Sequence, residues 1–175
     1  MTRSRNGLLL TAVIVVVGLP ARAEAQERRW MADITAGKAI FIDDTPDHLF
    51  AAGGAVRRLI TPRVSIGPEL VVMTGTGKGD AFDRVLLFTG NVVFDVNSVQ
   101  ARTGRRVTPF LVGGLGWVWE RSPLLTGSFW SNQPAFTAGG GIRARIGALV
   151  SAAAEYRVEG GLNQRFSGSL TFALS

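Results

Sequence analysis

The chain has 175 residues, a length that suits a single domain, with no cysteine and a net charge of +6 at pH 7. The absence of cysteine excludes disulfide bonds and thiolate chemistry, and no basic run is interleaved with aromatic residues, so nucleic-acid binding has no support. The 22 glycines disfavour long helices, and no segment after residue 25 has the roughly 18 consecutive apolar residues of a membrane-spanning helix.

Residues 1–25 have the layout of a secretory signal peptide. Arg3 and Arg5 precede an uncharged apolar run over residues 8–19, and Ala23-Glu24-Ala25 supplies small residues at the spacing of a cleavage site. The apolar run is shorter than the roughly 20 residues that a membrane-spanning helix needs. We therefore predict cleavage before Gln26, which leaves a mature chain, 26–175, with a net charge of +4.

The mature chain alternates between strand-like and turn-like segments, and no part of it has a clear helical period with caps. Proline, glycine and polar clusters separate the strands, and Pro68 within one strand predicts an edge or a bulge there. The predicted loops include 43–47, 75–80, 97–106 and 121–133. In chain order, we predict strands at 30–41, 48–60, 64–73, 83–96, 107–120, 136–146, 150–159 and 166–174.

The last three strands show the alternation most clearly. In the sixth, Ile142, Ala144 and Ile146 alternate with Arg143 and Arg145, and the next two strands repeat the pattern. A period of two over about ten residues indicates strands with two chemically different faces. One face is apolar and uncharged, and the other carries small residues and charges.

Eight strands joined mostly by short turns predict consecutive antiparallel neighbours in an up-and-down order. Eight strands are also enough for the sheet to close into a barrel whose interior side chains can fill, and closure removes the two edges of an open sheet. The sequence therefore predicts an all-β fold, an eight-stranded antiparallel up-and-down transmembrane β-barrel after a cleaved signal peptide.

Two kinds of barrel fit this count, and they differ in which face is inside. A soluble secreted barrel of the calycin type, such as a lipocalin, buries its apolar face and binds an apolar ligand, whereas an outer-membrane barrel turns that face to lipid. The uncharged apolar face and the small residues opposite favour the membrane barrel, and so do aromatic residues near strand ends, as in interfacial girdles. These aromatics are Trp30, Phe41, Trp117, Trp119, Trp130, Phe136, Tyr156, Phe166 and Phe172.

A membrane barrel would place several charged residues in its lumen. Isolated charges there are costly, so we expect opposite charges to pair across neighbouring strands in an ion-pair network. Such a network acts either as a gate for a narrow ion path or as a static core, and we favour the static core. The predicted members are Glu69, Asp95, Arg143, Arg145, Glu155 and Arg157.

Three segments resemble the OmpA/OmpX-like family of eight-stranded outer-membrane barrels: Thr108-Pro109-Phe110-Leu111-Val112-Gly113-Gly114-Leu115-Gly116, Gly139-Gly140-Gly141-Ile142-Arg143-Ala144-Arg145 and Ala154-Glu155-Tyr156-Arg157. The resemblance covers nearly the whole mature chain. It implies a Gram-negative outer membrane and carries over no catalytic residue. Many such barrels end in a phenylalanine that the assembly machinery recognises, whereas here Phe172 is followed by Ala173-Leu174-Ser175.

Catalytic, cofactor and metal sites have little support in the sequence. His48, the single histidine, lacks the nearby serine pattern of the outer-membrane lipid A deacylases, so a lipid-modifying enzyme is the least favoured alternative. Asp43, Asp44 and Asp47 lack the spacing of a calcium loop and suit a solvated turn. We expect no catalytic residue, no cofactor and no metal. The expected partners are outer-membrane lipid and the barrel-assembly machinery, and the expected state is a monomer with a structural, surface-interaction or narrow-pore role.

Overall fold

The structure, a computed structural model, describes residues 30–41, 47–75, 84–96, 107–124, 127–160 and 163–174. The predicted signal peptide and most of the predicted loop at 43–47 lie outside these ranges, as do nearly all of the loops at 75–80 and 97–106. Within the described ranges, no helix is long and apolar enough to cross a membrane. The strands are β1 (Trp30–Phe41), β2 (Asp47–Thr61), β3 (Val64–Gly75), β4 (Arg84–Asp95), β5 (Val107–Leu124), β6 (Gly127–Arg145), β7 (Val150–Glu159) and β8 (Asn163–Leu174).

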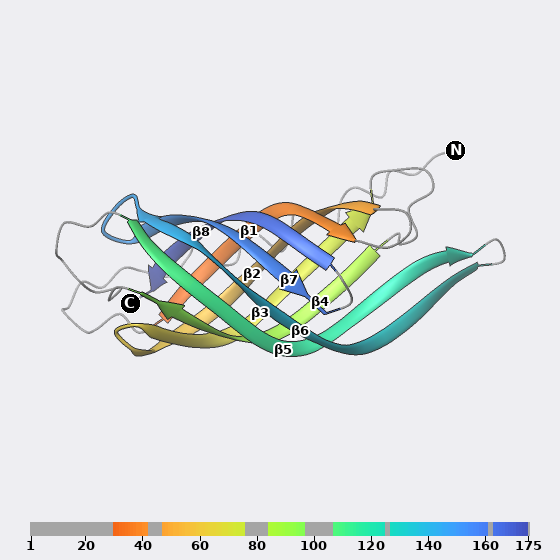
Figure 1. Cartoon of the computed structure of the whole chain (residues 1–175), viewed down its shortest axis with the longest axis horizontal. Helices are drawn as coiled ribbons and strands as arrows, with labels where there is room; N and C mark the ends of the chain where they lie inside the picture. Colours follow the sequence, from red (N-terminus) through yellow and green to blue (C-terminus); the bar gives the residue numbers. More distant parts are fainter. Residues whose placement is uncertain are drawn as a thin grey trace.

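The eight strands form one closed barrel in which each pairs antiparallel with its neighbours in the sequence (Figure 1). The barrel closes where β1 meets β8, with Trp30 opposite Leu174 at one end of the seam and Phe41 opposite Asn163 at the other. This seam runs the full length of β1, so the sheet has no open edge along its wall. The predicted eight-stranded up-and-down barrel is confirmed.

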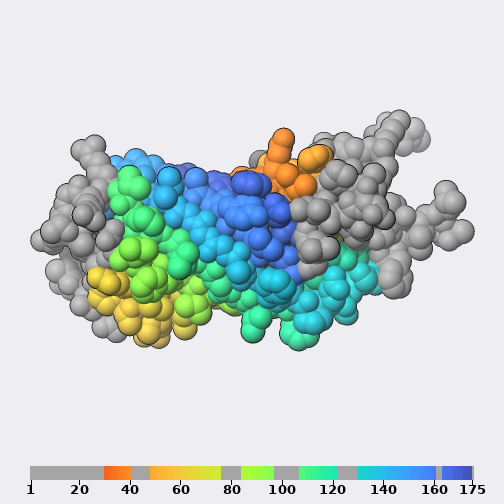
Figure 2. Space-filling model, in the orientation of Figure 1, coloured from red at the N-terminus to blue at the C-terminus, as the bar shows by residue number. Residues whose placement is uncertain are grey.

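β5 and β6 extend far beyond the other strands as a hairpin, which projects from the end of the barrel opposite the C-terminus (Figure 1). Their ladder continues without a break from Val107–Ala144 to Leu124–Gly127. The predicted loop at 121–133 is therefore wrong, because nearly all of it is strand. The hydrogen-bonded ladder overrides the Ser, Pro and Gly content that suggested a loop. In the space-filling view, the green and cyan residues of β5 and β6 run diagonally along this face of the molecule (Figure 2).

Pro68 and Pro134 lie where the pairing between neighbouring strands is interrupted or ends. Pro68 predicts an edge or a bulge, but β3 pairs with both β2 and β4 and is no edge strand. The β2–β3 ladder is interrupted between Ala55–Glu69 and Arg58–Ile66, next to Pro68, and its register does not shift there. In the projecting hairpin, β7 reaches only to Thr137 of β6. Beyond that point β6 has no neighbouring strand on this side within the described residues, and Pro134 lies on this open edge.

The two faces of the wall have opposite character. Alternate residues of each strand point outward, and the exposed large apolar side chains of the strands lie on this outer face, among them Leu115, Ile142 and Phe166. Ala154, Tyr156 and Leu170 are also exposed, and Phe172 is half-buried. A barrel that turns its apolar side chains outward is of the membrane type, not the soluble type.

Candidate functional site

The lumen collects the charged residues of the barrel wall. Odd-numbered residues point inward in every strand except β5, where even-numbered residues do so. Because each strand contributes one inward residue per two positions, charges far apart in the sequence meet at the barrel axis. The inward-facing ionised residues of the described strands that lie deep in the wall are Asp33, Arg57, Glu69, Asp95, Arg143, Glu155, Arg157, Glu159 and Arg165.

These charges form two groups. Glu69 of β3 is the centre of the group nearer the hairpin end, which we call the upper group. Its carboxylate accepts hydrogen bonds from Arg157 Nη1 on β7, from Arg165 Nη2 on β8 at 3.0 Å, and from Asn91 Nδ2 on β4. Glu69 is 4% exposed and Arg165 is fully buried. One carboxylate thus joins three other strands, and two guanidinium groups compensate for the cost of burying it.

The same group extends along β7 in both directions from Arg157, to Glu155 and to Glu159. Arg157 Nη2 donates to Glu155 Oε2 at 3.0 Å, and Ser167 Oγ donates to the other oxygen of Glu155 at 3.0 Å. Arg165 Nε lies 3.1 Å from Glu159 Oε1, whose second oxygen accepts a hydrogen bond from Asn163 Nδ2 at 3.3 Å. Each carboxylate in the group therefore has at least two polar contacts.

The second group, the lower group, lies toward the end of the barrel where β1 begins and β8 ends. Arg57 donates to both oxygens of Asp33, with Nε and Nη2 at 2.6 and 2.8 Å, and its third contact is Ser65 Oγ at 3.1 Å. Thr171 of β8 donates to Asp33 as well. This two-point geometry fixes the plane of the guanidinium group, and the contacts connect β1, β2, β3 and β8.

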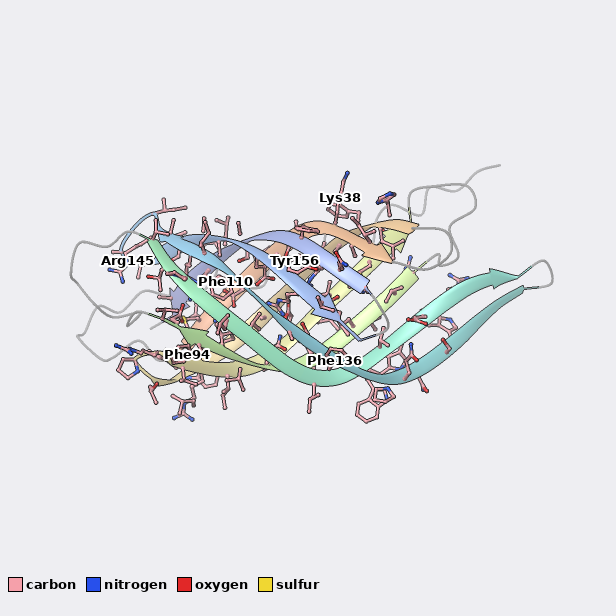
Figure 3. The ribbon with its side chains drawn as sticks, viewed as in Figure 1. Lys38, Phe94, Phe110, Phe136, Arg145 and Tyr156 are labelled. Atoms are coloured by element: carbon pink, nitrogen blue, oxygen red, sulfur yellow. The ribbon has the colours of Figure 1, made fainter. Side chains whose placement is uncertain are left out.

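A second ion pair completes the lower group. Arg143 Nη1 donates to Asp95 Oδ1 at 2.5 Å, and Asp95 is fully buried. The Arg143 guanidinium also lies 4.8 Å from the ring centroid of Phe110, within the range of a cation–π contact. Figure 3 shows Phe110 against the inner side of the wall. Phe110 thus covers one face of the guanidinium while Asp95 pairs with its edge.

A small cavity of about 30 Å³ separates the two groups. Its lining includes Asp33, Arg57, Glu69, Asn91 and Arg143, so both groups contribute to it. A cavity needs on the order of 10–15 Å³ to hold one water molecule, so this one has room for about two. It is far too small for a solute, and it is no continuous channel.

The lumen near the hairpin end is apolar. Side chains from β1 to β6 form a buried cluster there, and Val71, Met73 and Val85 in it are fully buried. An apolar cluster of this kind offers few polar partners for water. Its members are Ala39, Leu49, Ala51, Val71, Met73, Val85, Leu87, Val118 and Ala135.

The six residues predicted for the lumen network have two different positions. The structure brings together Glu69, Asp95, Arg143, Glu155 and Arg157 in the two groups described above. Arg145, in contrast, is exposed at the last position of β6, away from both groups (Figure 3). A strand end at the rim of the barrel is open to solvent whichever way its side chain points.

Four charged members of the two groups were not among the predicted lumen residues. Arg165 and Glu159 lie at the ends of strands, and the predicted last strand began one residue after Arg165. Asp33 and Arg57 lie on β1 and β2, where apolar residues on both faces hide the alternation. For Arg165 the signal was present, because it has the parity of Ser167 and Thr171, which also point inward.

His48 is exposed on the outer face of β2, away from the charges of the lumen. Asp43 and Asp44 lie outside the described residues. Among the residues that are described, no group of three or more His, Asp or Glu side chains is placed to hold a metal ion.

The fold is similar to that of solved bacterial barrels. Neisserial surface protein A superposes with a TM-score of 0.66 at 14% identity, over 83% of this chain and 96% of that one. The N-terminal β-barrel domain of Pseudomonas aeruginosa OprF gives 0.60 at 14% identity, over 81% and 96%. Ail, the attachment invasion locus protein of Yersinia pestis, gives 0.52 at 11% identity, over 82% and 93%. No protein-family model matches the chain, and no curated protein matches it in sequence.

Proposed function

We propose that this chain, which has the eight-stranded transmembrane barrel fold implied by its sequence resemblance, is an exported outer-membrane protein that conducts no solute and acts through its external surface. The observation that carries the proposal is the filled lumen. Buried ion pairs occupy its middle and lower part, and the apolar cluster closes the hairpin end. A pore needs a continuous polar path, and eight strands leave little space for one.

The location and orientation follow from the outer face and the strand count. The apolar outer face fits a lipid environment, and the structures with the same fold include a surface protein and an attachment protein by name. Because the number of strands is even, β1 begins and β8 ends on the same side of the membrane. We assign that side to the periplasm and the β5–β6 hairpin to the cell exterior, where the longer loops of such barrels lie.

In this proposal the lumen charges have a structural role. The two groups connect β1, β2, β3, β4, β6, β7 and β8 through side chains, which holds a cysteine-free wall in one shape. We infer a monomer that the barrel-assembly machinery inserts, with no catalytic residue and no cofactor. The projecting hairpin is then the part of the protein that is available to act outside the membrane.

Cell fractionation and conductance measurements test the proposal together. We expect the protein in the outer-membrane fraction, with a gel mobility that shifts on heating, as expected for a folded barrel. The purified protein should give no single-channel steps in a planar bilayer in which a larger porin conducts. Recovery as a freely soluble periplasmic protein would support the secreted ligand-binding barrel instead. Regular conductance steps would replace the closed lumen with a narrow pore.

A further inference from the structure

Arg58 places a positive charge on the apolar outer face of the barrel. It occupies an outward, exposed position of β2, three residues before the strand ends at Thr61, which is about 10 Å along the strand. Each of its four neighbours on this face is apolar and between 43% and 53% exposed: Val56, Ile60, Trp30 and Ile66. The guanidinium group therefore lies within the lipid-facing wall, close to the border at which β1 begins.

Trp30 holds this guanidinium group. The Arg58 Cζ atom lies over the indole of Trp30, 5.8 Å from the ring centroid, within the range of a cation–π contact. Trp30 is the first residue of β1, and tryptophan at the end of a membrane strand is typical of the headgroup layer. No described residue accepts a hydrogen bond from the Arg58 N–H groups. The indole covers one face of the guanidinium, and the edge is available for a bidentate contact with an anion.

No acidic residue occupies the same face as Arg58. At the outward positions of the described strands there is no aspartate or glutamate. Asp33 and Asp95, the acids of the described strands nearest this end, point into the lumen and pair there with arginines. Arg63, in the turn between β2 and β3, adds an exposed cation at this rim. The other charged residues at outward positions lie at the hairpin end, where Figure 3 labels the first of them: Lys38, Arg84 and Arg121.

The outer face of β2 becomes lower from Arg58 toward the middle of the barrel. The next outward residues are Val56 and Gly54, and Gly54 has no side chain. Opposite Gly54, Ile34 of β1 and Leu70 of β3 are 47% and 45% exposed. Gly54 therefore leaves a gap between two apolar side chains, in line with Arg58 along the strand. A hydrocarbon chain that followed β2 through this gap would have its polar end at the guanidinium group.

The chemistry of this surface selects its occupant. An apolar wall with one cation at its border suits a molecule with an acyl chain and an anionic headgroup. A zwitterionic headgroup would bring an ammonium group as well, and no carboxylate on this face is placed to pair with it. A lone arginine on a lipid-facing surface is tolerated near the headgroup layer, where its cost is small, so its position fits the same depth.

We propose that Arg58 and Trp30 bind the headgroup of an anionic phospholipid in the periplasmic leaflet. The guanidinium group donates to the phosphate, the indole packs beside the glycerol, and an acyl chain follows β2 past Gly54. This site rests on the proposed outer-membrane location and orientation. It gives the barrel a preferred lipid at the end opposite the projecting hairpin.

Trp30 can report on its own site. The chain has four tryptophans, and the other three, Trp117, Trp119 and Trp130, lie on β5 and β6. The full mature chain with these three changed to phenylalanine is folded into phosphatidylcholine vesicles that contain a minor fraction of phosphatidylglycerol with brominated acyl chains, which quench nearby indoles. Brominated phosphatidylcholine at the same fraction is the comparison. Both leaflets have one composition, so the direction of insertion does not affect the result.

We expect phosphatidylglycerol to be enriched about fivefold at Trp30, the gain expected from one basic residue beside an anionic headgroup. Arg58→Gln should reduce its quenching to that of phosphatidylcholine, and Arg58→Lys should give an intermediate value because it keeps the charge and loses the planar donors. Arg63→Gln is the matched control, since it removes an exposed arginine of the same β2–β3 hairpin that lies in the turn. It should leave the enrichment nearly unchanged.

Several outcomes would overturn the site. These are equal quenching by the two lipids, enrichment that survives Arg58→Gln, and an equal loss in Arg63→Gln, which would reduce the effect to general electrostatics. Sodium phosphate that displaces the lipid, where sodium chloride of the same ionic strength does not, would identify a free anion as the ligand.

Two further measurements separate the site from folding. Native mass spectrometry of the chain with all four tryptophans should show more retained phosphatidylglycerol than on Arg58→Gln. The heat-dependent gel shift of every variant is measured in parallel. A barrel that shifts normally but does not enrich phosphatidylglycerol contradicts only the site, whereas a chain that never forms a heat-modifiable barrel contradicts the proposed function.

Discussion

Asn91 and Gly114 face each other across the β4–β5 ladder, and Asn91 Oδ1 lies 1.9 Å from the point where a Cβ on residue 114 would stand. The missing side chain at Gly114 is therefore what allows Asn91 to lie against β5 while its Nδ2 donates to Glu69. A backbone position on one strand thus controls a hydrogen bond to the central carboxylate of the lumen. This relationship gives the first prediction.

Gly114→Ala should destabilise the barrel by about 2–3 kcal/mol, because the new methyl group meets both Asn91 and the carbonyl of Gly90. The control is Gly113→Ala in the next position, whose Cβ would point to lipid with its nearest neighbour, Thr137 O, at 3.8 Å. Urea unfolding in lipid vesicles, followed by the heat-dependent gel shift, measures both. Equal stability of the two variants would contradict the role given to Gly114.

Glu69→Ala should cost about 3–5 kcal/mol of unfolding free energy, because it leaves the guanidinium groups of Arg157 and Arg165 buried without their shared carboxylate. Glu120→Ala serves as control, since Glu120 is only half-buried and its hydrogen bond to Gln133 is long. That change should stay within about 1 kcal/mol. A double-mutant cycle of Glu69 and Arg157 should show strong coupling, and additive losses would argue against the pair.

The two arginines at the end of β6 should differ sharply. Arg143→Ala leaves the fully buried Asp95 without its guanidinium partner and should cost about 3–5 kcal/mol. Arg145→Ala alters an exposed position at the end of the strand and should change stability by less than about 1 kcal/mol. Unfolding in urea compares them directly. A loss at Arg145 as large as that at Arg143 would mean that both residues belong to one network.

The open edge of β6 should resist association because of Pro134. The N–H of Gly160 donates to the carbonyl of Phe136, so alternate residues of β6 point their backbone groups to this side, and Pro134 is the next of them. Proline offers no N–H to an added strand. Pro134→Val should therefore promote dimers or larger oligomers in detergent, as measured by light scattering after gel filtration.

Asn132→Val is the control for this edge, because it adds a β-branched apolar side chain without adding a backbone donor. We expect it to remain monomeric. Oligomers from Asn132→Val alone would assign the effect to the side-chain surface. A monomeric Pro134→Val would show that the hairpin edge is protected by something other than the proline.

The parts of the barrel that the sequence predicts well are those where the two faces differ in polarity. In β7, Ala154 and Tyr156 alternate with Glu155 and Arg157, and the strand bounds, the inward charges and the outward apolar residues all follow from that contrast. The same contrast decides between a membrane barrel and a soluble one. Where it is strong, parity alone gives the direction of a side chain.

Two features lack that contrast and could not be derived. The apolar cluster places Val71, Met73 and Leu87 inside the lumen, so both faces of these strand segments are apolar and parity loses its meaning. The long hairpin could not be predicted for another reason. Residues such as Pro123 and Ser128 favour loops locally and are held in strands only by the continuing ladder. Pairing between strands is not visible in local composition.

The seam between β1 and β8 can form only after the last strand is present. The hydrogen bond from Thr171 to Asp33 joins residues 138 positions apart, and the same carboxylate holds Arg57 of β2. No partial chain can complete this contact, because the eighth strand must be present before the first has its second neighbour. Pairings between residues so far apart in the sequence form slowly, because a long loop of chain must close first. The ion pair of Asp33 with Arg57 joins only the first two strands, whereas the hydrogen bond from Thr171 forms only when the last strand joins the first.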